Sequence, residues 1–244
     1  VMFLEHKYLK FKGLNLSLET LDGLIKHNGP YNDLKNFNKI IGLSNLKNKI
    51  NFEKNTFLEA QIAAISDDIA YNNHDIQDGI KAKLFSLDDL IEINFFKEIY
   101  KSYKTNIKKN NKDIIIYQII RDSINLMVKD VIKNTIKNLK NKKIKNTNDI
   151  INCKDKVVSF SNNFKKIEVE IKYFLRKKMY DNKEVIKKNN NGKKIIKKLF
   201  NNKKIKPLKF IDKKKVNSDK FRSISDYISG MTDRFAIQLY RSIT

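Results

Sequence analysis

The stretch Phe57–Gly79, FLEAQIAAISDDIAYNNHDIQDG, constrains the fold more tightly than any other part of this 244-residue chain. Its apolar side chains recur every three or four residues, which is the repeat of an α-helix with one packed face. These side chains are Leu58, Ile62, Ile65 and Ile69. The spacing therefore predicts a helix that runs through the whole stretch and packs along this row.

A second row of the same helix carries polar groups. Asp67, Tyr71 and Asp75 are spaced i, i+4 and i+8 and so share one side of the helix. Small residues precede this row and allow a neighbouring helix to approach closely: Ala60, Ala63 and Ala64. Polar groups between closely packed helices are typical of ligand and metal sites in helical proteins. The spacing alone also fits a solvated helix face, so both interpretations stay open at this point.

The composition favours an all-α protein. The chain has two prolines, seven glycines and 41% hydrophobic residues, which is ample for a core, and no stretch alternates in the manner of a β-strand. We expect further helices from Ser17, as N-cap, to about His27, at Leu87–Lys104 with Ser86 as N-cap, and at Ile114–Leu139, Asn162–Tyr180, Lys183–Asn201 with an interruption at Asn189–Gly192, and Ser223–Ile243. The segments Asn32–Asn55 and Lys203–Lys220 are expected to connect them.

His27 stands directly before the helix stop Asn28-Gly29-Pro30. A histidine at such a position is usually satisfied by packing or by the helix dipole. A role in a pocket is the alternative, and the sequence leaves both open.

The formal net charge of +24 ordinarily indicates a nucleic-acid or anionic partner. Nearly all the basic residues are lysines that stand among asparagines and isoleucines, the trio that the codons of an AT-rich genome favour. Codon bias is therefore a competing cause of the charge. Nucleic acid remains a second partner class, bound without sequence preference and in a salt-dependent way.

No apolar run approaches the ~20 residues needed to span a bilayer, and no charged-then-apolar signal opens the chain. We therefore expect a soluble, cytoplasmic protein with no membrane partner. The single Cys153 cannot form an internal disulfide and fits a reducing compartment.

The amino-acid sequences of several segments closely resemble those of the deoxyguanosinetriphosphate triphosphohydrolase-like branch of the HD-domain phosphohydrolases. The segments occur in family order along essentially the whole chain: LKFKGLNLSLETLDGLIKHNGP at Leu9–Pro30, EAQIAAISDDIAYNNHDIQDG at Glu59–Gly79, GIKAKLFSLDDL at Gly79–Leu90, FLRKKMY at Phe174–Tyr180 and SDYISGMTDRFAIQLY at Ser225–Tyr240. The resemblance implies the carboxyl-terminal portion of an HD-domain-like helical bundle with an appended helical region. We place the remainder of the HD domain at residues 1–139 and the phosphohydrolase-associated region at 140–244, because Lys140–Asn148 is a basic, asparagine-rich break.

The resemblance also assigns roles to the polar row. Asp67, the first of an aspartate pair, is similar to the distant aspartate that helps to hold a divalent metal such as Mg²⁺ or Mn²⁺. Tyr71 looks like the aromatic residue that packs on the deoxyribose, and Asp75 like the carboxylate that binds the 3′-hydroxyl. The dipeptide His74-Asp75 is literally an HD pair, but it runs into IQDG rather than the glycine- and proline-containing stretch of the family, so we do not assign it to the metal.

The family's first histidine, its metal-binding His-Asp pair and its catalytic histidine have no match in this sequence. We expect them upstream of residue 1, since Met2–Phe11 has the character of a helix already under way. The complete enzyme implied by the resemblance hydrolyses a deoxynucleoside triphosphate to deoxynucleoside and triphosphate and forms a homo-oligomer. This chain alone is then expected to be inactive, because one carboxylate cannot hold a metal or activate water. The alternative is a non-catalytic, basic helical module that binds nucleic acid or a protein partner.

Overall fold

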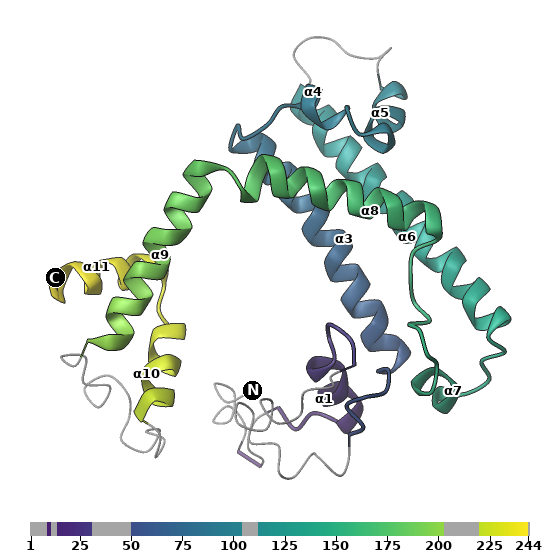
Figure 1. Cartoon of the computed structure of the whole chain (residues 1–244), viewed down its shortest axis with the longest axis horizontal. Helices are drawn as coiled ribbons and strands as arrows, with labels where there is room; N and C mark the ends of the chain where they lie inside the picture. The colour runs from purple at the N-terminus through teal and green to yellow at the C-terminus, as the bar shows by residue number, and fades with distance from the viewer. Residues whose placement is uncertain (1–8, 11–13, 31–49, 104–111, 203–219, 244) are drawn as a thin grey trace. The chain divides into compact units, whose positions relative to one another are not determined.

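Every regular element in the described part of the chain is a helix, as expected. The computed structural model describes residues 9–10, 14–30, 50–103, 112–202 and 220–243 (Figure 1). The expected connecting segments and the apolar segment Met2–Phe11 lie mostly outside these residues. The chain divides into two compact units, residues 1–175 and 176–244, and each is taken by itself.

The first unit is built around two long helices, α3 (Leu58–Lys81) and α6 (Lys112–Asn141), which pack against each other. Shorter helices surround them: α1 (Leu18–Ile25) and α8 (Asn162–Leu175) lie against α3, and α5 (Asn94–Lys101) lies against α6. Two short helices, α4 (Leu87–Leu90) and α7 (Thr147–Ile151), complete the unit. Its fully buried side chains are mostly large and apolar, among them Ile76, Leu90, Phe96, Ile119, Met127, Ile171 and Leu175.

Two predicted helix caps are confirmed. The hydroxyl of Ser17 accepts the backbone N–H of Thr20 at 3.3 Å, and α1 then ends at Ile25, close to the predicted end. Ser86 and Asp89 form a reciprocal capping box at the start of α4. These capping hydrogen bonds form between residues close in sequence, which is why the sequence predicts them well.

The single helix expected at Leu87–Lys104 is wrong, because the chain breaks between α4 and α5. Ile93 takes an extended conformation there, with φ −74° and ψ 118°. This turn puts Leu90, Ile93 and Phe96 into the core together, at 0%, 4% and 0% exposure. The free energy gained by burying three large apolar side chains outweighs the loss of helical hydrogen bonds at the break.

The second unit holds a π-helical turn (Arg176–Tyr180), α9 (Lys183–Asn201), α10 (Lys220–Ser229) and α11 (Asp233–Ile243). The interruption predicted at Asn189–Gly192 is absent from α9, where a side chain at Gly192 would meet open space. The helix predicted at Ser223–Ile243 divides instead near Gly230, and the hydroxyl of Thr232 accepts the N–H of Phe235 at the new start. The break lets both helices pack on the buried Ile195 and Leu199 of α9.

The predicted boundary at residues 139 and 140 is not where the compact units separate. The segment after α7 is tied back to the first unit, because Asn138 donates to the carbonyl of Val157 at 2.8 Å and Asn134 to that of Ser159 at 2.8 Å. Packing therefore keeps residues 140–175 with α3 and α6. The division into 1–139 and 140–244 stays a prediction about family domains.

Candidate functional site

The buried face of α3 follows the predicted row and carries amides as well as apolar groups. Ile69 is buried as predicted, Leu58 and Ile65 are half-buried, and Ile62 remains 45% exposed. The deepest positions on this face are Gln61, Ile69, Asn72, Asn73, Ile76 and Gly79. The helix is thus held by a mixed polar and apolar surface rather than by its isoleucines alone.

Gln61 is the best connected of these amides. Its Oε1 accepts the backbone N–H groups of Val157 and Val158 at 2.9 and 3.1 Å, and its Nε2 donates to the carbonyl of Thr56 at 2.9 Å. One buried side chain therefore fastens the segment before α8 to the start of α3. Asn73 acts similarly within the core, since its Nδ2 donates to the carbonyl of Ile69 and contacts Sδ of Met127.

The polar row Asp67, Tyr71 and Asp75 lies on another flank of α3. Tyr71 is 64% exposed, the side chain of Asp67 is 49% exposed, and Asp75 is half-buried. The aspartates and the tyrosine thus stay accessible while the amides of the same helix are buried. The roles assigned to the three residues stay predictions.

A close approach of α1 brings a fourth residue to this flank. A Cβ atom at Gly23 would lie only 2.7 Å from Cβ of Ala60, so a glycine and an alanine let the two helices meet. The approach confirms the spacing role predicted for Ala60. Just beyond the end of α1, Nε2 of His27 lies 3.5 Å from Oδ2 of Asp67. His27 thus lies beside Asp67 and at the neighbouring cleft, and its role in a pocket stays a prediction.

A cleft of about 380 Å³ begins beside this pair, between α3, the segment before α8 and α8 itself. Its wall includes His27, Asp68, Lys156, Lys165 and Lys172. The two consecutive aspartates of α3 face different partners, since Asp67 meets His27 whereas Oδ1 of Asp68 lies 3.8 Å from Nζ of Lys172. Sequence spacing alone cannot separate these two carboxylates.

Lys172 is the most strongly engaged cation of the cleft. Its Nζ lies 2.7 Å from Oε1 of Glu168. Burial acts to lower the pKa of Lys172, but the hydrogen bond and charge of Glu168, with the weaker effect of Asp68, raise the pKa above its ordinary value. The ammonium group therefore stays charged, and the two carboxylates hold it at the cleft wall.

The donor atoms around Asp67 suit a hard divalent ion but are too few to hold one. A carboxylate and an imidazole are the ligand types that Mg²⁺, Mn²⁺ and similar ions accept. Across the residues that the structure describes, no three His, Cys, Asp or Glu side chains come together as a metal site. Asp67 and His27 are thus one side of a site at most, and the exclusion of His74-Asp75 from the metal stays a prediction.

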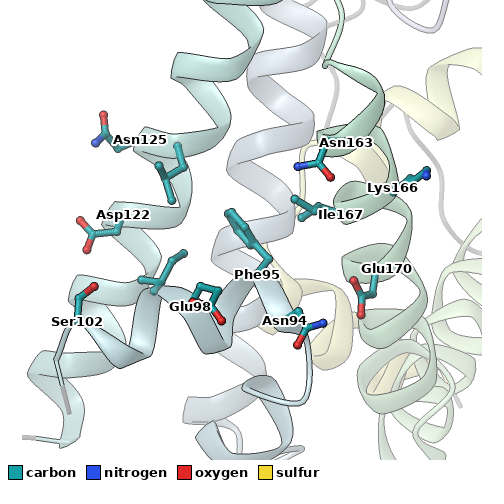
Figure 2. Close-up of a pocket in the computed structure, with 12 residues that line it drawn as sticks. Asn94, Phe95, Glu98, Ser102, Asp122, Asn125, Asn163, Lys166, Ile167 and Glu170 are labelled. Atoms are coloured by element: carbon teal, nitrogen blue, oxygen red, sulfur yellow. The ribbon is translucent and has the colours of Figure 1, made fainter.

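A second concavity, of about 660 Å³, lies away from the polar row, among α5, α6 and α8 (Figure 2). Phe95 and Ile167 line it, and carboxylates stand at its edge at Glu98, Asp122 and Glu170. Tyr103 donates a hydrogen bond to Asp122, and this bond raises the pKa of Tyr103. The acidic edge makes this concavity a poor place for a polyphosphate.

Comparison with known proteins agrees with the resemblance. A family model for the phosphohydrolase-associated domain matches residues 158–242. The deoxyguanosinetriphosphate triphosphohydrolase-like protein of Pelagibacter ubique is 66% identical over 243 residues, an alignment that covers 100% of this chain and 66% of the relative. Proteins of the same name from Rickettsia felis (34% identical over 98% of this chain and 64% of the relative) and Leptospira interrogans (38% identical over 100% of this chain and 62% of the relative) align as well.

The helical fold and the matched domain place the chain among the phosphohydrolase-type proteins. Within that class, the identity along its whole length makes it a member of the deoxyguanosinetriphosphate triphosphohydrolase-like family. The chain spans about two thirds of the length of these relatives. No helix that the structure describes is long and apolar enough to cross a membrane.

Proposed function

We propose that this chain supplies one part of a metal-dependent deoxynucleoside triphosphate triphosphohydrolase. In this reaction water attacks the α-phosphorus, the bond between that phosphorus and the 5′-oxygen breaks, and the 5′-oxygen takes up a proton. The products are a deoxynucleoside and inorganic triphosphate. The observation that carries the proposal is the accessible row Asp67, Tyr71 and Asp75 on a helix whose other face is locked into the core, in a chain 66% identical to a relative of that name.

Each residue of the row has a physically suitable position for its proposed role. Asp67 contributes a carboxylate oxygen to the metal, with His27 beside it as a further donor or as a hydrogen-bond partner. The exposed ring of Tyr71 offers a face on which a deoxyribose packs. Asp75, one helical turn further on, accepts a hydrogen bond from the 3′-hydroxyl, and without that hydroxyl its carboxylate would lose a partner.

The neighbouring cleft suits the rest of the substrate. Its wall carries Lys156, Lys165 and Lys172 against Asp68 and Glu168, a small excess of positive charge, and a triphosphate carries several negative charges. The metal itself would supply charge stabilisation at the phosphate and an activated water. Because the described residues hold no complete ligand set, we expect this chain alone to be inactive.

A chimaera tests the proposal directly. The part of the Pelagibacter relative that the alignment leaves out is joined to this chain, and the purified protein is incubated with dGTP and Mn²⁺ or Mg²⁺. We expect deoxyguanosine and triphosphate as products, loss of activity with a chelator and no activity from the 244-residue chain alone. A folded chimaera that hydrolyses no deoxynucleoside triphosphate, or that releases dGMP and diphosphate, would refute the proposal.

The helix α9 supports a second candidate function, non-specific nucleic-acid binding. Four of its lysines lie on the side of the helix away from the buried Ile195 and Leu199: Lys183, Lys193, Lys194 and Lys197. A lysine face along one helix is suited to follow a phosphate backbone. If this function holds, glutamine at these lysines weakens binding to single- and double-stranded oligonucleotides and flattens the salt dependence, while dGTP hydrolysis by the chimaera is unchanged.

A further inference from the structure

The concavity among α5, α6 and α8 differs in charge from the chain as a whole. Among the described residues that line it are three carboxylates, Glu98, Asp122 and Glu170, and one lysine, Lys166. The whole sequence, by contrast, carries 51 basic and 27 acidic residues. A hollow with excess carboxylates on so basic a chain attracts cations, whereas most of the surface repels them.

The same lining offers an apolar surface. Ile99 is buried there, and Ile167 is half-buried beside it. The half-buried ring of Phe95 packs edge-on against Phe96 and Phe164, with ring centres 5.2 and 5.8 Å away. A ring held in this way attracts a cation to its face, and the aliphatic side chains favour methylene groups. The volume of about 660 Å³ lies within the ~300–1,000 Å³ usual for small-ligand sites.

The three carboxylates are spread over three helices. Glu98 belongs to α5, Asp122 to α6 and Glu170 to α8 (Figure 2). In this view the ring of Phe95 lies between Asp122 and Glu170, and the side chain of Lys166 extends away from the ring. In the part of the chain that the structure describes, these carboxylates do not converge as a metal site. The arrangement therefore suits several cationic groups along one apolar chain better than a compact ion.

The partners of these carboxylates leave the negative charge in place. The hydroxyl of Tyr103 donates to Asp122, and Nε2 of Gln118 donates to the other carboxylate oxygen at 3.2 Å. Both donors are neutral, so they orient Asp122 without cancelling its charge. Glu98 pairs with Lys101 at 2.6 Å, but both side chains are more than half exposed. An exposed pair of this kind contributes little free energy, and a ligand ammonium group can replace the lysine.

We propose that this concavity binds a linear aliphatic polyamine. The ammonium groups pair with Glu98, Asp122 and Glu170, and the methylene groups between them lie on the apolar lining beside Phe95. Because the carboxylates come from α5, α6 and α8, the bound polyamine joins three helices of the first unit and stabilises it. The site lies away from Asp67 and Tyr71, and the proposal does not depend on the proposed activity.

Titration of the nucleotide-free 244-residue chain with spermidine gives the first test. At low ionic strength we expect saturable binding in calorimetry and a higher midpoint of thermal unfolding. Two controls separate the parts of the ligand, since hexane-1,6-diol has the methylene chain without charge and Mg²⁺ has charge without the chain. Both should raise the midpoint less than spermidine does. No saturable binding of spermidine at millimolar concentrations, or an equal effect of either control, overturns the proposal.

Exchange of carboxylates for amides locates the site. Glu170→Gln should weaken spermidine binding by about threefold, and the double variant Glu98→Gln/Glu170→Gln by about tenfold or more. These side chains are exposed, so the unfolding curves without ligand should stay close to that of the unaltered chain. Glu59→Gln is the matched control, because it removes the same charge from an exposed residue of α3. Unchanged binding by the double variant, or an equal loss from Glu59→Gln, would refute the site.

Discussion

The two flanks of α3 use polar residues in opposite ways. On the buried flank, Gln61 ties α3 to the segment before α8, and Asn73 donates to the carbonyl of Ile69 in its own helix and contacts Met127 of α6. On the open flank, Asp67 and Tyr71 are accessible, and Asp67 lies beside the half-exposed His27. The comparison teaches that buried polar side chains hold the helix in the first unit, while Asp67 and Tyr71 on the other flank stay accessible to a ligand. Predictions that alter one flank at a time test this division.

The largest effect on stability is expected from Gln61→Leu on the buried flank. The change leaves the buried N–H groups of Val157 and Val158 without their acceptor, and each such loss costs about 1–3 kcal/mol. We expect the free energy of unfolding to fall by about 2–4 kcal/mol in urea denaturation. Gln77→Leu is the matched control on α3 and should change the free energy of unfolding by less than about 0.5 kcal/mol. Equal effects of the two changes would argue against a special role for Gln61.

A smaller loss is expected from Gly79→Ala at the end of the same flank. The new Cβ atom would lie 2.2 Å from Cε1 of Phe85, whose ring is buried and packs edge-on against Phe174 at 4.9 Å. Since the ring has little room to move, overpacking should cost about 1–3 kcal/mol. Gly192→Ala in α9 meets no atom within 4 Å and should stabilise instead, by about 0.5–1 kcal/mol. Thermal denaturation followed by circular dichroism compares the two, and a stabilising Gly79→Ala would contradict the packing described.

On the open flank, Asp75→Asn should alter selection rather than stability. If Asp75 accepts the 3′-hydroxyl, the active chimaera prefers dGTP to dideoxy-GTP. The variant should lose roughly tenfold or more of that preference in kcat/KM, about 1.4 kcal/mol. An unchanged preference for dGTP over dideoxy-GTP, together with a normal unfolding curve, would show that Asp75 does not bind the 3′-hydroxyl.

The smallest change is expected from Tyr71→Phe. The phenyl ring keeps the surface that packs on a deoxyribose and loses only the hydroxyl, so kcat/KM of the chimaera should fall by less than about threefold. Because Tyr71 is exposed, the free energy of unfolding should stay within about 0.5 kcal/mol. Tyr71→Ala serves as the comparison and should have the greater effect on KM. Equal losses of kcat/KM from both changes would indicate that the hydroxyl of Tyr71, and not its ring, contacts the substrate.

Local chemistry made much of the fold predictable. The caps at Ser17 and Ser86 and the helix through Phe57–Gly79 depend on residues close in sequence, and all were confirmed. The breaks before Asn94 and after Gly230 were missed because packing of distant residues decides them. The apolar period of α3 gave the right face but could not show that Gln61 would be its main connection.

The candidate site was predictable in part for the same reason. Spacing placed Asp67, Tyr71 and Asp75 on one side of α3, whereas the neighbours of that side come from other segments. The approach of His27 to Asp67 depends on the contact between Gly23 and Ala60, and the Asp68–Lys172 pair joins residues from α3 and α8. The small residues Gly23 and Ala60 were the available signal for the first of these contacts.

The central claim is that the open flank of α3, and not its polar residues in general, serves the reaction. The most direct test compares Asp67→Ala with Asp68→Ala in dGTP hydrolysis by the chimaera with Mn²⁺. These adjacent carboxylates are similarly exposed, but one meets His27 and the other Lys172. We predict a loss of roughly a thousandfold or more in kcat for Asp67→Ala, and less than about tenfold for Asp68→Ala. Equal losses, or the greater loss from Asp68→Ala, would contradict the assignment.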